Sequence, residues 1–324
     1  MRSFPSRLQL LLLVIPLITT ACSGGGAVAP PGPATNDSTR GPSRSQAGPQ
    51  LEKPALITID LLTGDLLYWP IKEGPSGTPI TLTGNLGTYD ANALVSNGDV
   101  VIIASQTPAE IIEYNVKSKT ETIVPDPFGA PSHVAVDRAG TIYALGRHQV
   151  GVFPKGSSQP YKIDCRPLEH GRGLSIAVDD EQDVFVAAGP GIFELPAGSR
   201  DDCVKPHLRR PSNLGGIGID PKTDDFIVVD NPGYGCSYEG RITIYPKPYS
   251  VRTSSSHEFY VSYCAGGFRL DAHSKHIYIS DETVDESYPL IDRFSYPFPV
   301  DGQYYADYNA YTGGFTLIPS ALPN

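Results

Sequence analysis

Short apolar runs alternate with polar turns along residues 54–324, and the alternation repeats. The stretch from Ser132 reads SHVAVDRAGTIYALGRHQVGVFPKG, and the stretch from Leu174 reads LSIAVDDEQDVFVAAGPGIFELPAG. Each contains an apolar run ending in Asp, a polar turn, a β-branched run, a second turn and an apolar residue followed by Pro. Such runs predict β-strands. No convincing helical periodicity accompanies them, so the pattern predicts an all-β fold.

Two markers recur in step along the chain. Apolar runs end at Asp137, Asp179, Asp220 and Asp271, at intervals of 42, 41 and 51 residues, and Val95 precedes Asp137 by 42. The second marker is a Pro that ends a strand-like run, because Pro cannot donate to a sheet ladder. It occurs at Trp69-Pro70, Phe153-Pro154, Leu195-Pro196, Tyr245-Pro246 and Tyr296-Pro297, and Asn115-Val116 fills the remaining slot. Six four-stranded units of this period predict a six-bladed β-propeller, whereas a parallel β-helix has repeats roughly half as long.

The first unit lacks one strand. ALITIDLLTGDLLYWPI, from Ala55, supplies a second strand, a third strand and the Pro marker, but no first strand. The chain ends with TGGFTLIPSALPN, which repeats the opening of the units at AGGFRLD from Ala265 and NLGGIGID from Asn213. We therefore expect residues 313–319 to complete blade one as its inner strand and to close the ring. The doubled glycines predict a close approach of inner strands at the channel.

The first 22 residues have the features of an export signal. Arg2 and Arg7 accompany an apolar run over residues 8–18 that is shorter than the roughly 20 residues of a membrane-spanning helix. Thr20-Ala21-Cys22 resembles the lipobox of bacterial lipoproteins, although that family more often has Leu where Thr19 stands. The resemblance implies a lipidated Cys22 at the mature N-terminus, and ordinary signal cleavage near Ala21 is the alternative.

Residues 23–53 are dominated by Gly, Pro, Ser, Thr and Ala, so we expect a disordered tether ahead of a propeller spanning residues 54–324. The resulting expectation is a protein of the bacterial cell envelope, anchored by lipid, with the propeller in the periplasm or outside the cell. The formal charge of −10 becomes 23 − 35 = −12 once Arg2 and Arg7 are removed with the signal. A chain this acidic offers no electrostatic basis for nucleic-acid binding.

Four cysteines remain once Cys22 is set aside, which favours two disulfides in an oxidising compartment. None belongs to a CxxC motif or has a histidine at ligand spacing, so a zinc site is not expected. Cys236 and Cys264 fall in loops on the same face of blades five and six, and we predict that they pair. The second predicted pair is Cys165–Cys203, in blades three and four, where the loops are expected nearer opposite faces.

The unit PSHVAVDRAGTIYAL resembles the NHL-like repeat, in which Pro, apolar residues, Asp, Gly and a Tyr-containing strand recur. The resemblance covers nearly the whole folded region and implies a six-bladed propeller. NHL-like propellers include enzymes, ligand-binding modules and protein-interaction platforms, so the fold does not decide the function.

A metal or other cofactor is not expected. Gluconolactonase-type propellers, which resemble this fold, hold a divalent cation with Glu, Asn and Asp at the channel mouth. Of the six corresponding positions here only Asp90 carries a carboxylate: Asp90, Ser132, Leu174, Gly215, Gly266 and Gly313. The acidic stretch at residues 281–289 lacks the alternating spacing of a calcium loop and is interpreted as a solvated loop.

Polar residues near the channel mouth are the candidates for chemistry. His133 follows the start of an inner strand and could act as a general base, although a histidine hydrogen-bonded at a strand start is the simpler interpretation. Glu169, His170 and Arg172 could bind an anion or transfer a proton, or could lie in a solvated loop leading into blade four. The full set of candidate binding residues is Asp90, Asn92, His133, His170, Arg172 and Asn213.

Two functions remain open from the sequence. The first is a surface-anchored, non-catalytic propeller that presents a face to an unidentified protein or glycan. The alternative is a channel-mouth enzyme, a lyase or lactonase-like hydrolase, that uses His133 or the Glu169, His170 and Arg172 loop. The lack of a convergent catalytic set in the sequence favours the binding protein.

Overall fold

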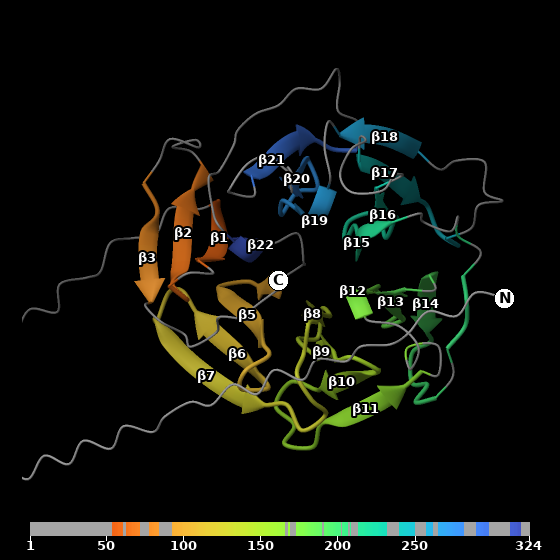
Figure 1. Cartoon of the computed structure of the whole chain (residues 1–324), viewed down its shortest axis with the longest axis horizontal. Helices are drawn as coiled ribbons and strands as arrows, with labels where there is room; N and C mark the ends of the chain where they lie inside the picture. The colour runs from red at the N-terminus through yellow and green to blue at the C-terminus, as the bar shows by residue number, and fades with distance from the viewer. Residues whose placement is uncertain are drawn as a thin grey trace, which may run out of the picture. The chain divides into compact units, whose positions relative to one another are not determined.

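The fold is all-β. In the computed structural model the described residues are 54–60, 63–71, 78–83, 93–165, 168, 173–189, 191–201, 203–206, 208, 213–231, 240–249, 257–261, 265–281, 290–297 and 312–318. They form 22 strands in six antiparallel sheets arranged around a common centre (Figure 1). The predicted six-bladed β-propeller is therefore confirmed. No helix among these residues is long and apolar enough to span a membrane.

The strands are given from the centre of the ring outward. Blade one contains β22 (Thr312–Ile318), β1 (Ala55–Asp60), β2 (Leu66–Pro70) and β3 (Ile80–Thr83). Blade two contains β4 (Ala93–Asn97), β5 (Val100–Ser105), β6 (Glu110–Asn115) and β7 (Thr120–Pro125). Blade three contains β8 (His133–Val136), β9 (Ile142–Leu145), β10 (Gln149–Phe153) and β11 (Tyr161–Asp164).

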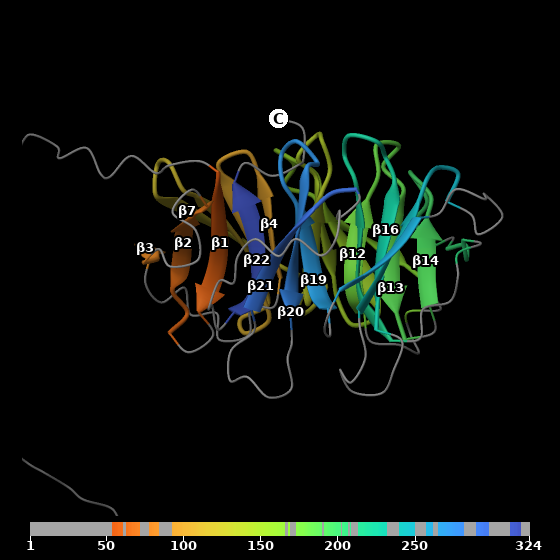
Figure 2. The same cartoon turned by 90° about the horizontal axis from the view of Figure 1, so that it is seen from above.

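The other three blades follow the same order. Blade four contains β12 (Gly173–Val178), β13 (Val184–Ala188) and β14 (Gly191–Leu195), with an isolated bridge between Glu194 and Val204 outside them. Blade five contains β15 (Leu214–Ile219), β16 (Phe226–Asp230), β17 (Gly240–Tyr245) and β18 (His257–Val261). Blade six contains β19 (Ala265–Leu270), β20 (His276–Asp281) and β21 (Leu290–Ser295). From the side, the inner strands run along the ring axis (Figure 2).

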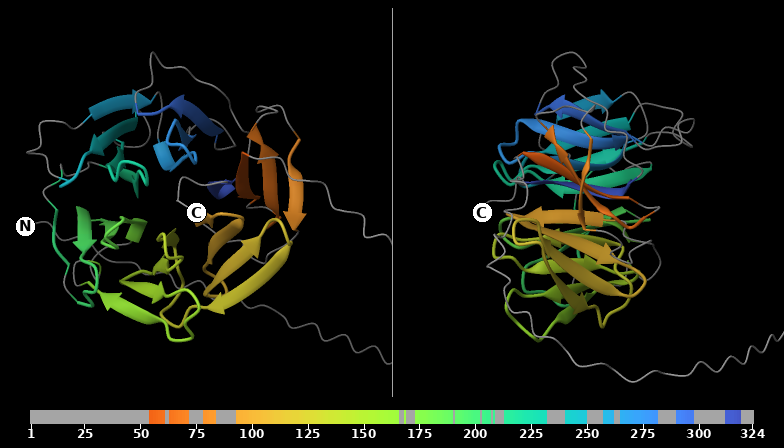
Figure 3. Two further views of the ribbon diagram at one scale, coloured as in Figure 1. Left: turned by 180° about the vertical axis from the view of Figure 1, so that it is seen from behind. Right: turned by 90° about the vertical axis from the view of Figure 1, so that its left-hand side faces the viewer.

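The C-terminal strand β22 completes blade one, as the sequence predicted. It pairs antiparallel with β1, with Ala55 opposite Ile318 and Thr58 opposite Phe315. Figure 1 shows β22 at the inner edge of the sheet formed by β1, β2 and β3, and the same arrangement is seen from the opposite face in Figure 3. Segments from both ends of the folded region thus share one sheet.

The hydrophobic core lies between the blades. Six clusters of buried side chains are found among the described residues, and each draws on two neighbouring blades. Phe315 and Leu317 of β22 belong to the cluster between blades six and one, whereas Ile318 belongs to the cluster between blades one and two. Successive residues of a strand point to opposite faces, so β22 packs against both neighbouring blades.

The recurring Asp forms the turn from the inner strand to the second strand. Asp137 Oδ1 accepts a hydrogen bond from the Thr141 amide at 2.7 Å, and Asp179 Oδ1 accepts the equivalent bond from the Asp183 amide at 2.8 Å. The same bond recurs at Asp271. Short Asp side chains stabilise turns by bonding to backbone amides a few residues on, which explains why this repeat marker is an aspartate.

The predicted close approach of inner strands occurs between blades five and six. A Cβ atom at Gly215 would overlap the carbonyl oxygen of Ala265, and one at Gly218 would lie 2.6 Å from the Phe268 ring. Only glycine permits this separation of β15 and β19. The absence of a Cβ atom at these two glycines therefore sets the width of the channel on this side.

Candidate functional site in the central channel

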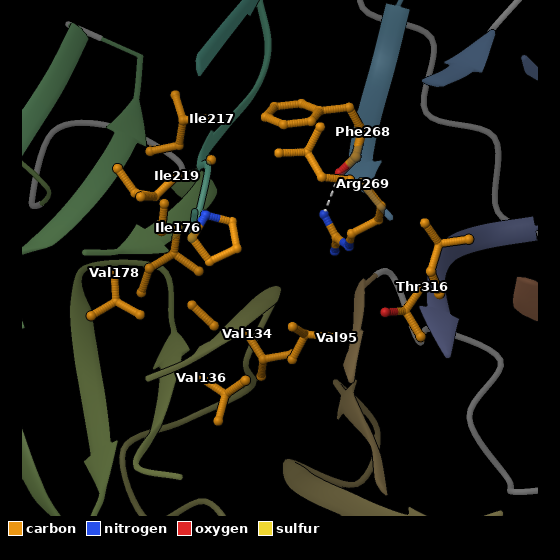
Figure 4. A pocket seen from close by; sticks show the side chains of 16 residues that line it. Val95, Val134, Val136, Ile176, Val178, Ile217, Ile219, Phe268, Arg269 and Thr316 are labelled. Atoms are coloured by element: carbon orange, nitrogen blue, oxygen red, sulfur yellow. Dashed lines mark hydrogen bonds between the residues drawn. The ribbon is translucent and has the colours of Figure 1, made fainter. Parts of the chain in front are cut away.

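The inner strands enclose a cavity of about 110 Å³. All six inner strands contribute to its wall, which is mainly aliphatic (Figure 4). The lining residues shown with labels are Val95, Val134, Val136, Ile176, Val178, Ile217, Ile219, Phe268, Arg269 and Thr316. Arg269 is the one charged residue of the described lining.

Arg269 reaches from blade six across to blade two. Its NH1 donates to the carbonyl of Phe268 at 2.7 Å, and its NH2 donates to the carbonyl of Leu94 at 2.6 Å. The guanidinium carbon lies 6.0 Å from the centre of the Phe315 ring in blade one. In Figure 4 the guanidinium group points into the channel from β19.

The environment of Arg269 disfavours its charge. Its Nε is buried and has no hydrogen-bond partner among the described residues, and no described carboxylate forms an ion pair with it. Burial lowers the pKa of Arg269 to about 10, because desolvation penalises the charged form. The group still carries its proton at neutral pH.

A second arginine, Arg138, lies at the end of the channel where the inner strands turn into the second strands, and it is paired with a carboxylate. Arg138 NH2 donates to the carbonyl of Pro221 at 2.7 Å and pairs with Asp180 at 2.6 Å. Pro221 also lines the cavity. Arg138 therefore links blades three, four and five at one mouth of the channel, and its charge has a carboxylate partner.

The two described candidate residues from the sequence lie at strand starts. His133 begins β8, and its Nδ1 lies 3.2 Å from Ser132 Oγ, which in turn donates to the carbonyl of Leu145. Asn213 is exposed, and its backbone N–H donates to Asp230 Oδ1 at 2.9 Å. Neither residue lines the cavity. The remaining candidates, Asp90, Asn92, Glu169, His170 and Arg172, lie outside the described residues, so they stay predictions.

Arg269 is not among the site residues predicted from the sequence. The signal that could have found it is the repeat itself, since Ala135, Ala177 and Gly218 occupy the equivalent position of three other inner strands, two residues before the recurring Asp. A large cation in a position that holds small apolar residues in three other blades is a departure from the repeat. Such departures are expected where a site is built on a regular scaffold.

The disulfide Cys165–Cys203 is present, with a Cα–Cα distance of 5.7 Å. This confirms the second predicted pair but corrects the expectation that the two loops lie nearer opposite faces. The segment after β14 returns along blade four, where Glu194 bridges Val204 and the Asp164 amide donates to the carbonyl of Arg200, and this brings Cys203 beside Cys165. Cys236 and Cys264 lie outside the described residues, so their pairing stays a prediction.

Three carboxylates in the turns of blades four and five share one lysine. Lys247 Nζ pairs with Asp179 at 3.3 Å and also with Glu181 and Asp224. Burial and the nearby charge of Asp179 raise the pKa of the Asp224 carboxyl. These oxygens lie close enough to hold an ion, but the ammonium group of Lys247 already supplies the positive charge, so the arrangement is a salt-bridge network.

A larger groove of about 680 Å³ lies between blades two and three. Its wall is largely apolar, with Glu113 and Lys155 as its charged residues among those described. The apolar residues come from both blades: Val100, Ile102, Ile111, Val124, Pro125, Pro127, Ile142, Phe153, Pro154 and Pro160. β7, the outermost strand of blade two, contributes Val124 and Pro125 to this wall.

Comparison with known proteins identifies the fold and no family. No family model matches the sequence, and no curated protein matches it significantly. A nidogen/laminin complex structure matches with a TM-score of 0.58 and 13% identity, over 82% of this chain and 98% of that chain. TolB from Acinetobacter baumannii matches with a TM-score of 0.57 and 10% identity, over 82% of this chain and 66% of that chain. A Bacteroides thetaiotaomicron protein of unknown function matches with a TM-score of 0.51 and 14% identity, over 78% of this chain and 64% of that chain. These are propeller proteins, and identities this low show the fold alone.

Proposed function

We propose that this protein is a bacterial envelope lipoprotein with an NHL-like propeller that binds another protein and catalyses no reaction. The observation that carries the proposal is the groove between blades two and three. Its volume of about 680 Å³ falls within the range of about 300–1,000 Å³ typical of ligand sites. A rigid ring of sheets with one concave apolar surface is suited to recognition.

The chemistry of the groove favours a protein partner over a glycan. Its wall is aliphatic and proline-rich. Contact with a partner's apolar side chains would remove this surface from water, which is favourable in proportion to the area buried. The outer edge of β7 also offers backbone groups to an extended segment of a partner.

The composition of the channel supports a non-catalytic role. The described lining of the cavity contains no His, Asp, Glu, Cys, Lys or Tyr side chain that could act in acid–base catalysis. His133, the strongest catalytic candidate from the sequence, instead lies within hydrogen-bonding distance of its neighbour Ser132 at a strand start. The similar structure of a nidogen/laminin complex is an example of this fold in a protein–protein assembly.

A substitution on β7 tests the binding proposal. Val124→Asp places a charge in the wall of the groove, and we expect it to abolish capture of the partner from a bacterial envelope extract, because a charge at an apolar contact must be desolvated on binding. Tyr260→Asp is the matched control, since Tyr260 is 56% exposed on β18, the outer strand of blade five. Capture that survives Val124→Asp, or that is lost equally in both variants, would exclude the groove as the binding surface.

The anchor rests on the resemblance of residues 20–22 to the lipobox and on the export signal before it. Cys22→Ala removes the only thiol that could accept the lipid there. We expect this variant to keep an unchanged melting temperature but to lose detergent partitioning and incorporation of labelled palmitate. Cys22→Ser serves as the nearly isosteric control and should behave in the same way. Membrane partitioning that persists in both variants would remove the anchor from the proposal.

A further inference from the structure

We propose that the central channel binds a small organic carboxylate, whose anionic group pairs with the Arg269 guanidinium and whose short aliphatic chain contacts the surrounding Val and Ile side chains. This inference goes beyond the proposed binding of a protein at the groove between blades two and three. It rests on three features of the channel: a cation without an anionic partner among the described residues, an apolar wall and a small volume.

The guanidinium of Arg269 has unused hydrogen-bonding capacity. Arginine carries five N–H donors, and the described residues provide acceptors for two of them, the carbonyl oxygens of Phe268 and Leu94. Nε is buried without a partner among those residues. Two carbonyl dipoles and the face of the Phe315 ring stabilise the cation in part, but none of them supplies a negative charge.

A bound anion would offset this cost. The side chain is partly buried, with Nε covered. A charge withdrawn from water without a counterion is unfavourable, and the guanidinium at pH 7 remains positive because its lowered pKa of about 10 still exceeds the pH. A carboxylate presents two oxygens to the planar fork of donors, which is the geometry that arginine binds best. One cation balances one negative charge, so a monocarboxylate fits better than a phosphate or sulfate dianion.

The wall and the volume limit the rest of the ligand. Val134, Ile176 and Ile217 stand on the inner strands of blades three, four and five around the same cavity (Figure 4). Aliphatic side chains offer contact to a hydrocarbon chain but no hydrogen bonds to a sugar or a base. The volume of about 110 Å³ is well below the range of about 300–1,000 Å³ for drug-sized ligands. A chain of a few carbons is therefore the expected body of the ligand.

Calorimetric titration of the full chain with sodium acetate, propionate and butyrate tests the proposal. We expect saturable binding that tightens roughly fourfold with each added methylene until the cavity is full. Sodium chloride at the same ionic strength and neutral butyramide are the probes that separate a carboxylate site from a general anion effect or from apolar binding alone. We expect neither to saturate the site.

Substitution of Arg269 separates the channel from other cationic positions. Arg269→Met should weaken butyrate binding by roughly 10- to 100-fold, the value of a hydrogen bond to a charged group. Arg200→Met removes the same charge from an exposed residue outside the channel and should leave binding unchanged. Arg269→Lys retains the charge without the planar fork, so an intermediate affinity is expected if both matter.

Three results would overturn the inference: equal responses to butyrate and chloride, equal responses to butyrate and butyramide, or undiminished butyrate binding by Arg269→Met. If Arg269→Met does not fold, the first two comparisons on the unsubstituted chain and the Arg269→Lys titration still decide the question. None of these measurements involves a protein partner. The capture assay therefore tests the groove proposal and the titrations test the channel proposal, so either can fail without the other.

Discussion

Deletion of residues 312–324 is expected to unfold the propeller at 37 °C. The deletion removes β22, and with it the inner strand of blade one and the hydrogen bonds to β1. Phe315, Leu317 and Ile318 are each at most 4% exposed, and they belong to the clusters on both sides of blade one. The deletion therefore opens the ring at two interfaces between blades.

The size of the effect follows from the burial. Each of these three side chains contributes roughly 1.5–3 kcal/mol when buried, so their loss alone amounts to about 5–9 kcal/mol. This is comparable with the whole stability of a typical domain, about 5–15 kcal/mol. The hydroxyl of Ser96 in β4 also loses its buried acceptor, the carbonyl of Leu317. Circular dichroism during heating would show the loss of the cooperative transition.

A deletion of the same length elsewhere is the control. Removing residues 30–42 takes 13 residues from the segment that the sequence predicts to be a tether, and the melting temperature should not change. Addition of a synthetic peptide of residues 312–319 to the C-terminal deletion variant should restore part of the transition, because the peptide can pair with β1 in the place of β22. A C-terminal deletion variant that melts within a few degrees of the full chain would contradict the closing role of β22.

The architecture was predictable because it repeats. The Asp that ends an inner strand is fixed by the turn it forms, as at Asp137, and the Pro that ends a third strand is fixed by its inability to donate to the ladder. Most blades impose the same local requirement, so the sequence repeats the same residue in most units. The closure was predictable for the same reason, because Gly314 and Phe315 repeat Gly267 and Phe268.

The site was far less predictable, because function depends on single departures from the repeat. Arg269 occupies a position held by Ala135 in blade three, and its contacts to Leu94 and Phe315 join three blades that the sequence alone does not place at a common point. His133 attracted attention as a titratable residue, but a strand-start histidine near Ser132 does not reach the cavity. Residue type indicated chemistry, whereas only the ring geometry showed which residues face the channel.

A buried ion pair in blade five gives the second large expected effect. Asp230 ends β16 and pairs directly across the sheet with Arg241 of β17, and the two side chains form a salt bridge at 2% and 8% side-chain exposure. Asp230→Ala leaves the Arg241 guanidinium buried without this carboxylate. We expect the free energy of unfolding to fall by about 3–5 kcal/mol, the usual result of removing one partner of a buried pair. Urea denaturation followed by tryptophan fluorescence would measure it.

An exposed pair supplies the matched control for this substitution. Lys162 and Asp164 lie 3.0 Å apart with side chains 48% and 58% exposed, so Asp164→Ala should change the free energy by less than about 1 kcal/mol. In the double variant of Asp230→Ala with Arg241→Ala the unpaired charge is gone, so its destabilisation should be smaller than the sum of the single effects by about 0.5–3 kcal/mol. Additive single effects would mean that Asp230 stabilises the blade chiefly by accepting the hydrogen bond from the backbone N–H of Asn213. Because that bond fixes the start of β15, Asp230→Asn, which keeps a side-chain acceptor for the amide, would then recover most of the lost stability.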